Sequence, residues 1–174
     1  FLHLSGLAML GAGALGGATL TRQSHRPLLL SARNGAAGRH YAVGFRLDGS
    51  QAFSTQVASR CHDISVHPQQ PLALFVGRRP GTESYLIDCR DGRLLQTLRT
   101  PADRHFYGHA VFHKDGEWLY STENDTREPG RGVLGVWRLS NGQLQRHSEL
   151  STHGIGPHQL LWLPDGETLV VANG

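Results

Sequence analysis

A repeat of 47 to 49 residues constrains the fold of this chain more than any other feature. Three stretches with one pattern carry their histidines at His62, His109 and His158. Each histidine stands at the entry of a short apolar run, which a turn rich in Pro, Asp or Gly joins to a second apolar run. A period of about 40–50 residues is typical of propeller blades, which bury their apolar faces only by stacking on one another.

Each period contains four short apolar segments separated by turn signals. Asp115-Gly116 and Asp165-Gly166 separate the first segment from the second, and Asp91-Gly92 and Asn141-Gly142 separate the third from the fourth. Such dipeptides between apolar runs predict tight hairpins, so one period predicts one four-stranded blade. The expected strands are 28–32, 41–46, 51–56, 63–67, 72–77, 83–88, 94–99, 109–113, 118–123, 132–139, 144–150, 159–163 and 168–172.

The sequence therefore predicts an all-β fold, a β-propeller of four-stranded blades. Residues 62–100 and 109–151 form complete blades, residues 28–59 a partial one, and a last blade begins at His158. Propellers close with about four to eight blades. We therefore expect an N-terminal fragment of a longer propeller.

Composition excludes several classes of function. Hydrophobic residues make up 39% and charged residues 18%, values that suit a folded soluble domain. The formal net charge is only +3, and the basic residues are scattered singly. Because nucleic-acid binding requires a clustered basic surface, we expect no nucleic-acid partner.

The N-terminal segment has the pattern of an export signal. Residues 7–20 carry no charge and are rich in Gly and Ala, and a polar segment follows them. Such a stretch has the length of a signal-peptide core and is too short to span a bilayer well. We expect an incomplete signal peptide over 1–26, propeller blades over 27–174, and no stable membrane span after cleavage. A buried Gly/Ala-rich helix is the alternative.

The two cysteines, Cys61 and Cys89, are expected to remain unpaired. Blade geometry places them at opposite ends of strands two places apart, about 15 Å from each other at ~3.3 Å of rise per residue. A disulfide requires Cα atoms within about 7 Å.

The repeated histidines are the candidate functional residues. Innermost strands of a propeller begin around one mouth of the central channel, so His62, His109 and His158 are expected to approach a common axis. Neutral imidazoles suit a transition-metal ion, and His105 and His153 are secondary candidates. In the alternative interpretation, each histidine donates a hydrogen bond to the backbone of the next blade and locks the blades together.

Other motifs favour no chemistry. Glu123-Asn124-Asp125, with Glu128 and Arg131, could offer oxygen ligands to a hard cation, but a capped turn explains the same residues. The nucleophile elbow, the P-loop and the Cys-x-x-Cys motif are absent from the sequence. No catalytic residue is assigned.

Two stretches resemble a bacterial family, the domain of unknown function fifteen-thirteen. They are His105-Phe-Tyr-Gly-His-Ala-Val-Phe with its continuation to Gly130-Arg-Gly-Val-Leu-Gly-Val, and His153-Gly-Ile-Gly-Pro-His with its continuation to Gly174. The resemblance covers roughly residues 28–174. It implies an exported periplasmic propeller, with seven blades in the full protein, encoded beside imelysin-type iron-uptake proteins. The weakly hydrophobic, Gly-rich segment 7–20 separately leaves the twin-arginine route as one option for export.

Three functional hypotheses follow. The first is a non-catalytic periplasmic propeller that binds a ligand or partner, with periplasmic iron-uptake proteins as the partners that the resemblance implies. The second is a metal-dependent propeller enzyme, an oxidoreductase or a lactonase-like protein, with its site at the histidine-lined mouth. A scaffold without any ligand is a third hypothesis.

Overall fold

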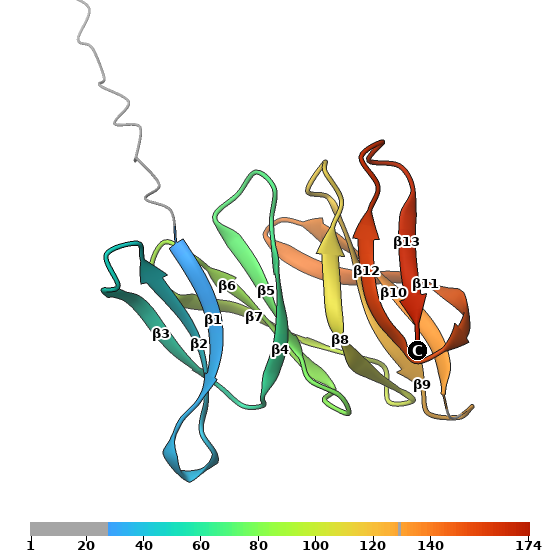
Figure 1. The fold of residues 1–174 in the computed structure, drawn as a ribbon, viewed down its shortest axis with the longest axis horizontal. Helices are drawn as coiled ribbons and strands as arrows, with labels where there is room; N and C mark the ends of the chain where they lie inside the picture. The colour runs from blue at the N-terminus through green and yellow to red at the C-terminus, as the bar shows by residue number, and fades with distance from the viewer. Residues whose placement is uncertain (1–27, 129) are drawn as a thin grey trace, which may run out of the picture.

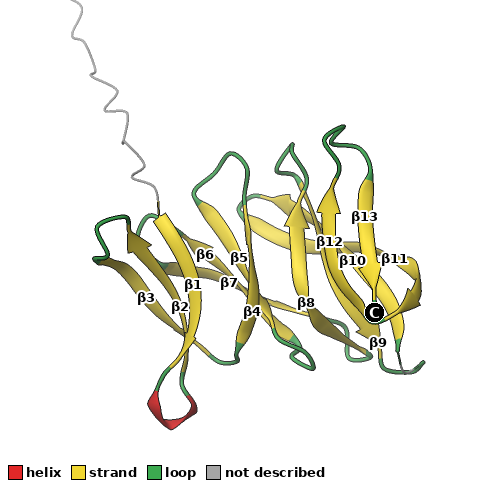
Figure 2. Ribbon diagram, viewed as in Figure 1, coloured by secondary structure: helices red, strands yellow, loops and turns green. Residues whose placement is uncertain are grey.

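The computed structural model describes residues 28–128 and 130–174, and the regular structure of this part is almost entirely β-strand (Figures 1 and 2). The expected signal segment, residues 1–26, lies outside the described residues. One short 3₁₀ turn, Ala36–Gly38, interrupts the strands. The strands are β1 Leu28–Asn34, β2 His40–Arg46, β3 Gln51–Val57, β4 Cys61–Val66, β5 Leu72–Gly77, β6 Glu83–Asp88, β7 Arg93–Arg99, β8 Arg104–Phe112, β9 Trp118–Asp125, β10 Arg131–Ser140, β11 Gln143–Ile155, β12 Pro157–Trp162 and β13 Leu169–Asn173.

The strands pair into four antiparallel sheets, each built from consecutive segments of the chain. Two sheets have four strands, in the orders β4-β5-β6-β7 and β8-β9-β10-β11. A three-stranded sheet, β1-β2-β3, precedes them, and the hairpin β12-β13 follows. These sheets correspond to the expected complete and partial blades, so the all-β propeller architecture is confirmed.

The first strands of successive blades lie side by side. β8 packs against both β4 and β12, and all three run in the same direction (Figure 1). They are the innermost strands of their blades, and the later strands of each blade extend away from them (Figure 1). Their equivalent ends therefore come together, which positions the candidate site.

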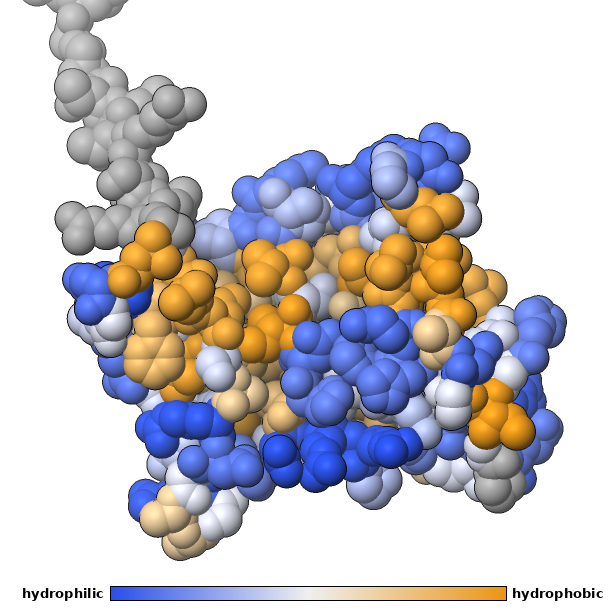
Figure 3. Space-filling model, in the orientation of Figure 1, coloured by the Kyte–Doolittle hydropathy of each residue, from blue (hydrophilic) through white to orange (hydrophobic). Residues whose placement is uncertain are grey.

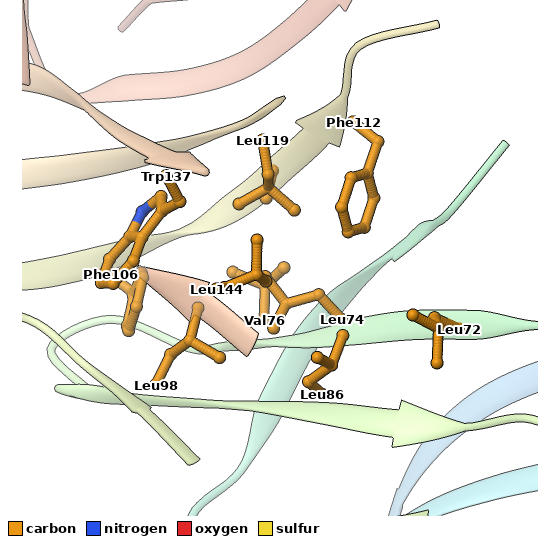
Figure 4. Close-up of a cluster of buried hydrophobic side chains, with 11 residues drawn as sticks. Leu72, Leu74, Val76, Leu86, Leu98, Phe106, Phe112, Leu119, Trp137 and Leu144 are labelled. Atoms are coloured by element: carbon orange, nitrogen blue, oxygen red, sulfur yellow. The ribbon is translucent and has the colours of Figure 1, made fainter. Parts of the chain in front are cut away.

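Apolar side chains between the blades hold them together. Between the second and third blades, a cluster includes Leu74, Leu86 and Leu119, all fully buried (Figure 4). A second cluster between the first and second blades contains Phe75 and Tyr85. Burial of each such side chain contributes about 1.5–3 kcal/mol, so inter-blade packing is a main source of stability.

Turn chemistry agrees with the hairpin predictions. Asn141 and Gly142, between β10 and β11, have φ values of 52° and 75°. Two positive φ angles are what a type I′ turn requires, and Asn-Gly adopts them readily. The same dipeptide position in the preceding blade, Asp91-Gly92, also has a glycine with positive φ, 79°.

Three elements differ from the sequence expectations, and one of them, β11, continues to Ile155, beyond the expected end at residue 150. β8 begins at Arg104 rather than at His109, because the strand continues through an irregularity that no periodicity reveals. Glu123 and Asp125 lie at the end of β9, not in a loop, and both are fully buried. Glu123 pairs with Arg146 at 2.7 Å, whereas Asp125 accepts a hydrogen bond of 3.0 Å from the backbone N–H of Arg127, as the capped-turn interpretation expects.

The remaining expectations concern cysteines and membranes. Cys61 and Cys89 are both free thiols, and burial raises the pKa of Cys61 to about 12 and that of Cys89 to about 11. Within the described residues, no helix is long and apolar enough to cross a membrane.

Candidate metal site at the mouth of the innermost strands

The structure brings His62, His109 and His158 together. The rings of His62 and His109 are 5.0 Å apart between centroids, and those of His109 and His158 are 5.1 Å apart. One ring nitrogen from each of the three histidines lies within 4.8 Å of the others. They come from β4, β8 and β12, one per blade, as the repeat predicts. In the space-filling view, a hydrophilic patch over these strands interrupts the apolar band along the blades (Figure 3).

The regular strand pairing is interrupted at each of the three histidines, by a bulge in β4 and β12 and by a longer irregularity in β8. The pairing of β4 with β5 shifts between Cys61 and Asp63, and that of β12 with β13 shifts between Pro157 and Gln159. The register of β8 against β9 shifts between Phe106 and Ala110, around His109. A bulged residue leaves the regular alternation of the strand and can aim its side chain differently. The repeated bulges therefore explain why side chains of three separate strands converge.

His109 is the most constrained member of the group. It is only 8% exposed, and its Nδ1 donates a hydrogen bond of 2.8 Å to the Oδ2 atom of Asp63. This bond leaves Nε2 as the unprotonated nitrogen of the neutral ring. Nε2 is buried, and no hydrogen-bond partner for it is found among the described residues. A carboxylate that orients a histidine in this way is the usual second shell of a metal ligand.

The polar environment keeps these groups in ligand-competent states. Burial and the neighbouring His109 lower the pKa of His62, which favours the neutral imidazole that binds metals. Burial acts to raise the pKa of the Asp63 carboxyl, but the hydrogen bonds from His109 and from the Ile64 amide, together with the nearby imidazoles of His109 and His62, outweigh it and hold that pKa below its usual value. Asp63 therefore remains an acceptor for His109.

Glycine permits the close approach of β8 to β4. Gly108 has a φ of 119°, and a Cβ atom at this position would lie 2.7 Å from the His62 ring. A side chain there would displace the imidazole, so the small residue before His109 is part of the site.

The spacing of the three nitrogens suits a metal ion after a small closure. Nitrogen ligands at about 2.0–2.1 Å from a tetrahedral zinc ion are about 3.3 Å apart. The separations of up to 4.8 Å are larger than this value. His62 and His158 are both exposed, so their rings can turn towards the buried His109 without repacking the core.

The secondary candidates lie outside this group. The Nδ1 atom of His105 is 3.0 Å from the carbonyl oxygen of Phe106, and its ring stacks on Tyr107. His153 is exposed in β11, with a φ of 54°. The structure thus brings together the three primary candidates and neither secondary one.

Two other histidines make the bonds between blades that the alternative interpretation assigns to His62, His109 and His158. His67 follows β4, and its Nε2 donates to the Gly116 carbonyl oxygen of the next blade at 3.1 Å. His113 follows β8 and bonds to the Gly166 carbonyl oxygen at 3.0 Å in the same way. Locking by backbone hydrogen bonds therefore occurs at the opposite ends of the innermost strands.

Sequence reasoning missed Asp63. An acidic residue directly after the repeated histidine is the available signal, and only this blade has one, because Ala110 and Gln159 follow the other two histidines. The carboxylate contacts the histidine of the next blade rather than its own neighbour, and strand order alone does not reveal that contact.

Comparison with known proteins supports both family and fold. Residues 55–174 match the family model described as "Protein of unknown function (DUF1513)". The chain belongs to this family. The match confirms the resemblance expected from the motifs, which lie within these residues. No curated protein sequence matches the chain.

Solved structures similar to this DUF1513 chain include two proteins described as candidate 6-phosphogluconolactonases. The protein from Bacteroides uniformis has 17% identity and a TM-score of 0.58, with coverage of 94% of this chain and 52% of that one. The protein from Bacteroides fragilis has 18% identity and a TM-score of 0.57, with coverage of 87% and 49%. The dihydro-heme d1 dehydrogenase NirN has 16% identity and a TM-score of 0.53, with coverage of 73% and 28%. At these identities the likeness shows the fold alone. The chain spans about half the length of the two Bacteroides proteins and less of NirN.

Proposed function

We propose that this DUF1513 chain is part of a ligand-binding propeller whose ligand is a transition-metal ion held by His62, His109 and His158. The observation that carries the proposal is the buried, unpartnered Nε2 of His109, whose Nδ1 is fixed by Asp63. A buried polar atom without a partner costs about 1–3 kcal/mol, a cost that a metal ion would remove. Imidazole ligands suit zinc, copper, iron and nickel.

Titration of the 174-residue chain with Co²⁺ tests the proposal. We expect saturable binding of one ion per chain, with the visible absorption of tetrahedral or five-coordinate cobalt and displacement by Zn²⁺. A His105→Ala variant is the matched control, because His105 lies in the same strand as His109 but outside the group. Loss of cobalt binding in this control but not in a His109→Ala variant would contradict the proposal.

A metal-dependent enzyme is the second candidate function. Three protein ligands leave a coordination position for water or substrate, as in catalytic zinc sites. The structural neighbours described as candidate 6-phosphogluconolactonases make a lactone the first substrate to test. The enzyme hypothesis expects metal-dependent hydrolysis of 6-phosphogluconolactone that is lost in His109→Ala. Equal rates in the metal-loaded and metal-free chains would reject this substrate.

The family resemblance adds a location and a setting to the proposal. We propose that the full protein acts in the periplasm with proteins of iron uptake, without catalysing a reaction itself. Cell fractionation tests the location, and the metal that copurifies from the periplasm tests the setting. Recovery of the protein with its N-terminal segment intact in the cytoplasm would contradict export.

A further inference from the structure

Two arginines stand opposite each other at the end of the second blade that carries His62. Arg60 directly precedes β4, Arg78 directly follows β5, and the backbone N–H of Arg78 donates a hydrogen bond of 2.9 Å to the carbonyl oxygen of Arg60. They extend the ladder of these strands by one pair, beyond Cys61 and its partner Gly77. Opposite residues of an antiparallel pair have Cβ atoms about 4.5–5.5 Å apart, and like charges there are destabilising. The fold therefore holds two positive charges close together at a cost in stability.

The third blade neutralises the corresponding edge. Arg104, the first residue of β8, is the ladder partner of Asp125, the last residue of β9, and their side chains form an ion pair of 3.0 Å. Asp125 also pairs with Arg127 at 3.0 Å. A carboxylate opposite an arginine is thus compatible with this end of a blade, but the second blade has an arginine in its place. An anion bound between two arginines would remove their repulsion, as Asp125 does for Arg104.

Both arginines adjoin the histidine group. Arg60 and His62 line one cavity of about 490 Å³, to which β1 contributes Arg33. Burial lowers the pKa of His62, and the nearby charge of Arg78 acts in the same direction. In Figure 3 strongly hydrophilic side chains gather at the lower ends of these strands, below the apolar band. A small ligand at this mouth would therefore meet the imidazole and the guanidinium groups together.

The charge at the mouth favours an anion. Among the described residues that line the cavity, the one carboxylate is Asp63, and it accepts the hydrogen bond from His109. A divalent ion on the histidines would add further positive charge. The guanidinium group of arginine is always charged, and its fork of N–H donors matches the paired oxygens of a carboxylate or a phosphate. These properties point to a ligand that carries such a group.

We propose that Arg60 and Arg78 bind an oxyanion, the carboxylate or phosphate group of a small molecule, at the histidine mouth. The inference rests on the metal site proposed above for one contact, because a ligand oxygen would take the coordination position that three histidines leave open. The two guanidinium groups hold the other oxygens. The ligand of the proposed function is then a small anionic molecule rather than a neutral one.

Three sugars that differ in charge are the probes. Glucose 6-phosphate carries a phosphate group, gluconate carries a carboxylate, and glucose carries neither. We expect isothermal titration at low ionic strength to show one charged sugar bound per cobalt-loaded chain, with a change in the visible absorption of the cobalt ion. Glucose should not bind. The charged sugar that binds more tightly identifies the group that the arginines prefer.

Variants of the two arginines test their role. Arg60→Gln and Arg78→Gln should each weaken binding of the charged sugar at least tenfold, and both side chains are exposed, so the variants should fold, as circular dichroism checks. Arg60→Lys keeps the charge without the fork and should retain part of the affinity. Arg46→Gln is the matched control for net charge. Arg46 ends β2 at the opposite end of the blade, where it bonds to Ser50 and to the carbonyl oxygen of Gln51.

Cobalt titration separates this inference from the metal proposal. Cobalt should bind the Arg60→Gln and Arg78→Gln variants at least as tightly as the unmodified chain, because each change removes a positive charge. Cobalt binding without binding of either charged sugar would overturn the anion site and leave the metal site in place. Binding of a charged sugar to the metal-free chain that is lost in Arg60→Gln, without cobalt binding in any variant, would support the arginine pair and reject the metal site. Equal losses of sugar affinity in Arg46→Gln and Arg60→Gln would also overturn the anion site, because net charge would then explain the binding.

Discussion

The innermost strands β4 and β8 carry histidines at both ends, and the two ends use them differently. His67 and His113 follow β4 and β8, and each bonds to a carbonyl oxygen in the next blade. His62, His109 and His158 lie at the bulged ends, where their rings face one another. The same residue type thus joins blades at one end of the strands and gathers at the other.

Hydrogen-bond satisfaction separates the two groups. Both ring nitrogens of His67 are used, since Nδ1 accepts from the amides of Gln69 and Gln70 while Nε2 donates to Gly116. His109 has one nitrogen bonded to Asp63 and the other buried without a partner. A saturated histidine stabilises the fold, whereas an unsaturated buried nitrogen is available for a ligand. Replacement of one histidine from each group therefore tests the comparison.

The largest expected effect is the loss of metal binding in His109→Ala. This change removes the only buried ligand and leaves two exposed imidazoles that no second shell orients. Since loss of an orienting group alone typically costs 10- to 100-fold in metal affinity, we expect loss of this ligand to cost at least about 100-fold. Isothermal titration with Co²⁺ measures the change. His113→Ala, from the other group, should bind cobalt like the unmodified chain, and a similar loss there would break the comparison.

His67→Ala should instead reduce the stability of the fold. The change removes a buried side chain and leaves the carbonyl group of the buried Gly116 without its bond, while the amides of the exposed Gln69 and Gln70 lose their acceptor. We expect a loss of about 2 kcal/mol in the free energy of unfolding, within the range for buried unsatisfied groups. Urea denaturation measures it. His62→Ala is the control, because His62 is exposed and should change stability by less than about 0.5 kcal/mol.

The contrast between the two groups also marks how far the sequence predicts the site. The 47- and 49-residue spacings predict that His62, His109 and His158 occupy equivalent positions, because a repeat places equivalent residues on equivalent strands. Spacing does not predict that their rings meet, since that depends on bulges, which insert residues into β4 and β12 without any mark in the apolar pattern. The alternative interpretation predicts that histidines join the blades by backbone hydrogen bonds. The structure shows such bonds, but His67 and His113 make them, at the other end of the innermost strands.

The fold itself follows from local signals to a greater extent. Alternating apolar segments and Asp-Gly or Asn-Gly turns place nearly every strand to within a few residues. The largest differences are in β8, which begins before the apolar run that starts at His109, and in β11, which continues past residue 150 to Ile155. Burial of Glu123 could not be predicted either, because its partner Arg146 comes from β11, two strands away in the sheet.

Asp63→Asn should weaken metal binding less than His109→Ala does. An amide oxygen can still accept the hydrogen bond from Nδ1 of His109, but it lacks the charge that increases the basicity of the imidazole. We expect about a tenfold loss of cobalt affinity, at the lower end of the second-shell range. Asp115→Asn is the matched control, since Asp115 pairs with His113 in the other group. Equal affinities for cobalt in the Asp63→Asn variant and the unmodified chain would show that the Asp63 carboxylate does not support metal binding.

The smallest expected effect is a change in pH dependence. Burial lowers the pKa of His67, and this effect exceeds the opposing influence of the Gly116 carbonyl group and Asp115. The unfolded chain therefore binds a proton at this residue more readily than the folded chain does. Stability should fall as the pH drops below about 6.5, the pKa of an unperturbed histidine, towards the lower pKa of the folded state. Urea midpoints at pH 7.5 and 5.5 measure the slope, which should be shallower in His67→Gln. The pKa of His62 is also lowered, so His62→Gln should remove a separate part of the pH dependence of stability. Bound Zn²⁺ should increase the contribution of His62 to this pH dependence, because protons compete with the metal for the imidazole. An unchanged slope in His67→Gln would mean that His67 binds a proton as readily in the folded chain as in the unfolded chain, which would contradict its burial and its use of both ring nitrogens in hydrogen bonds.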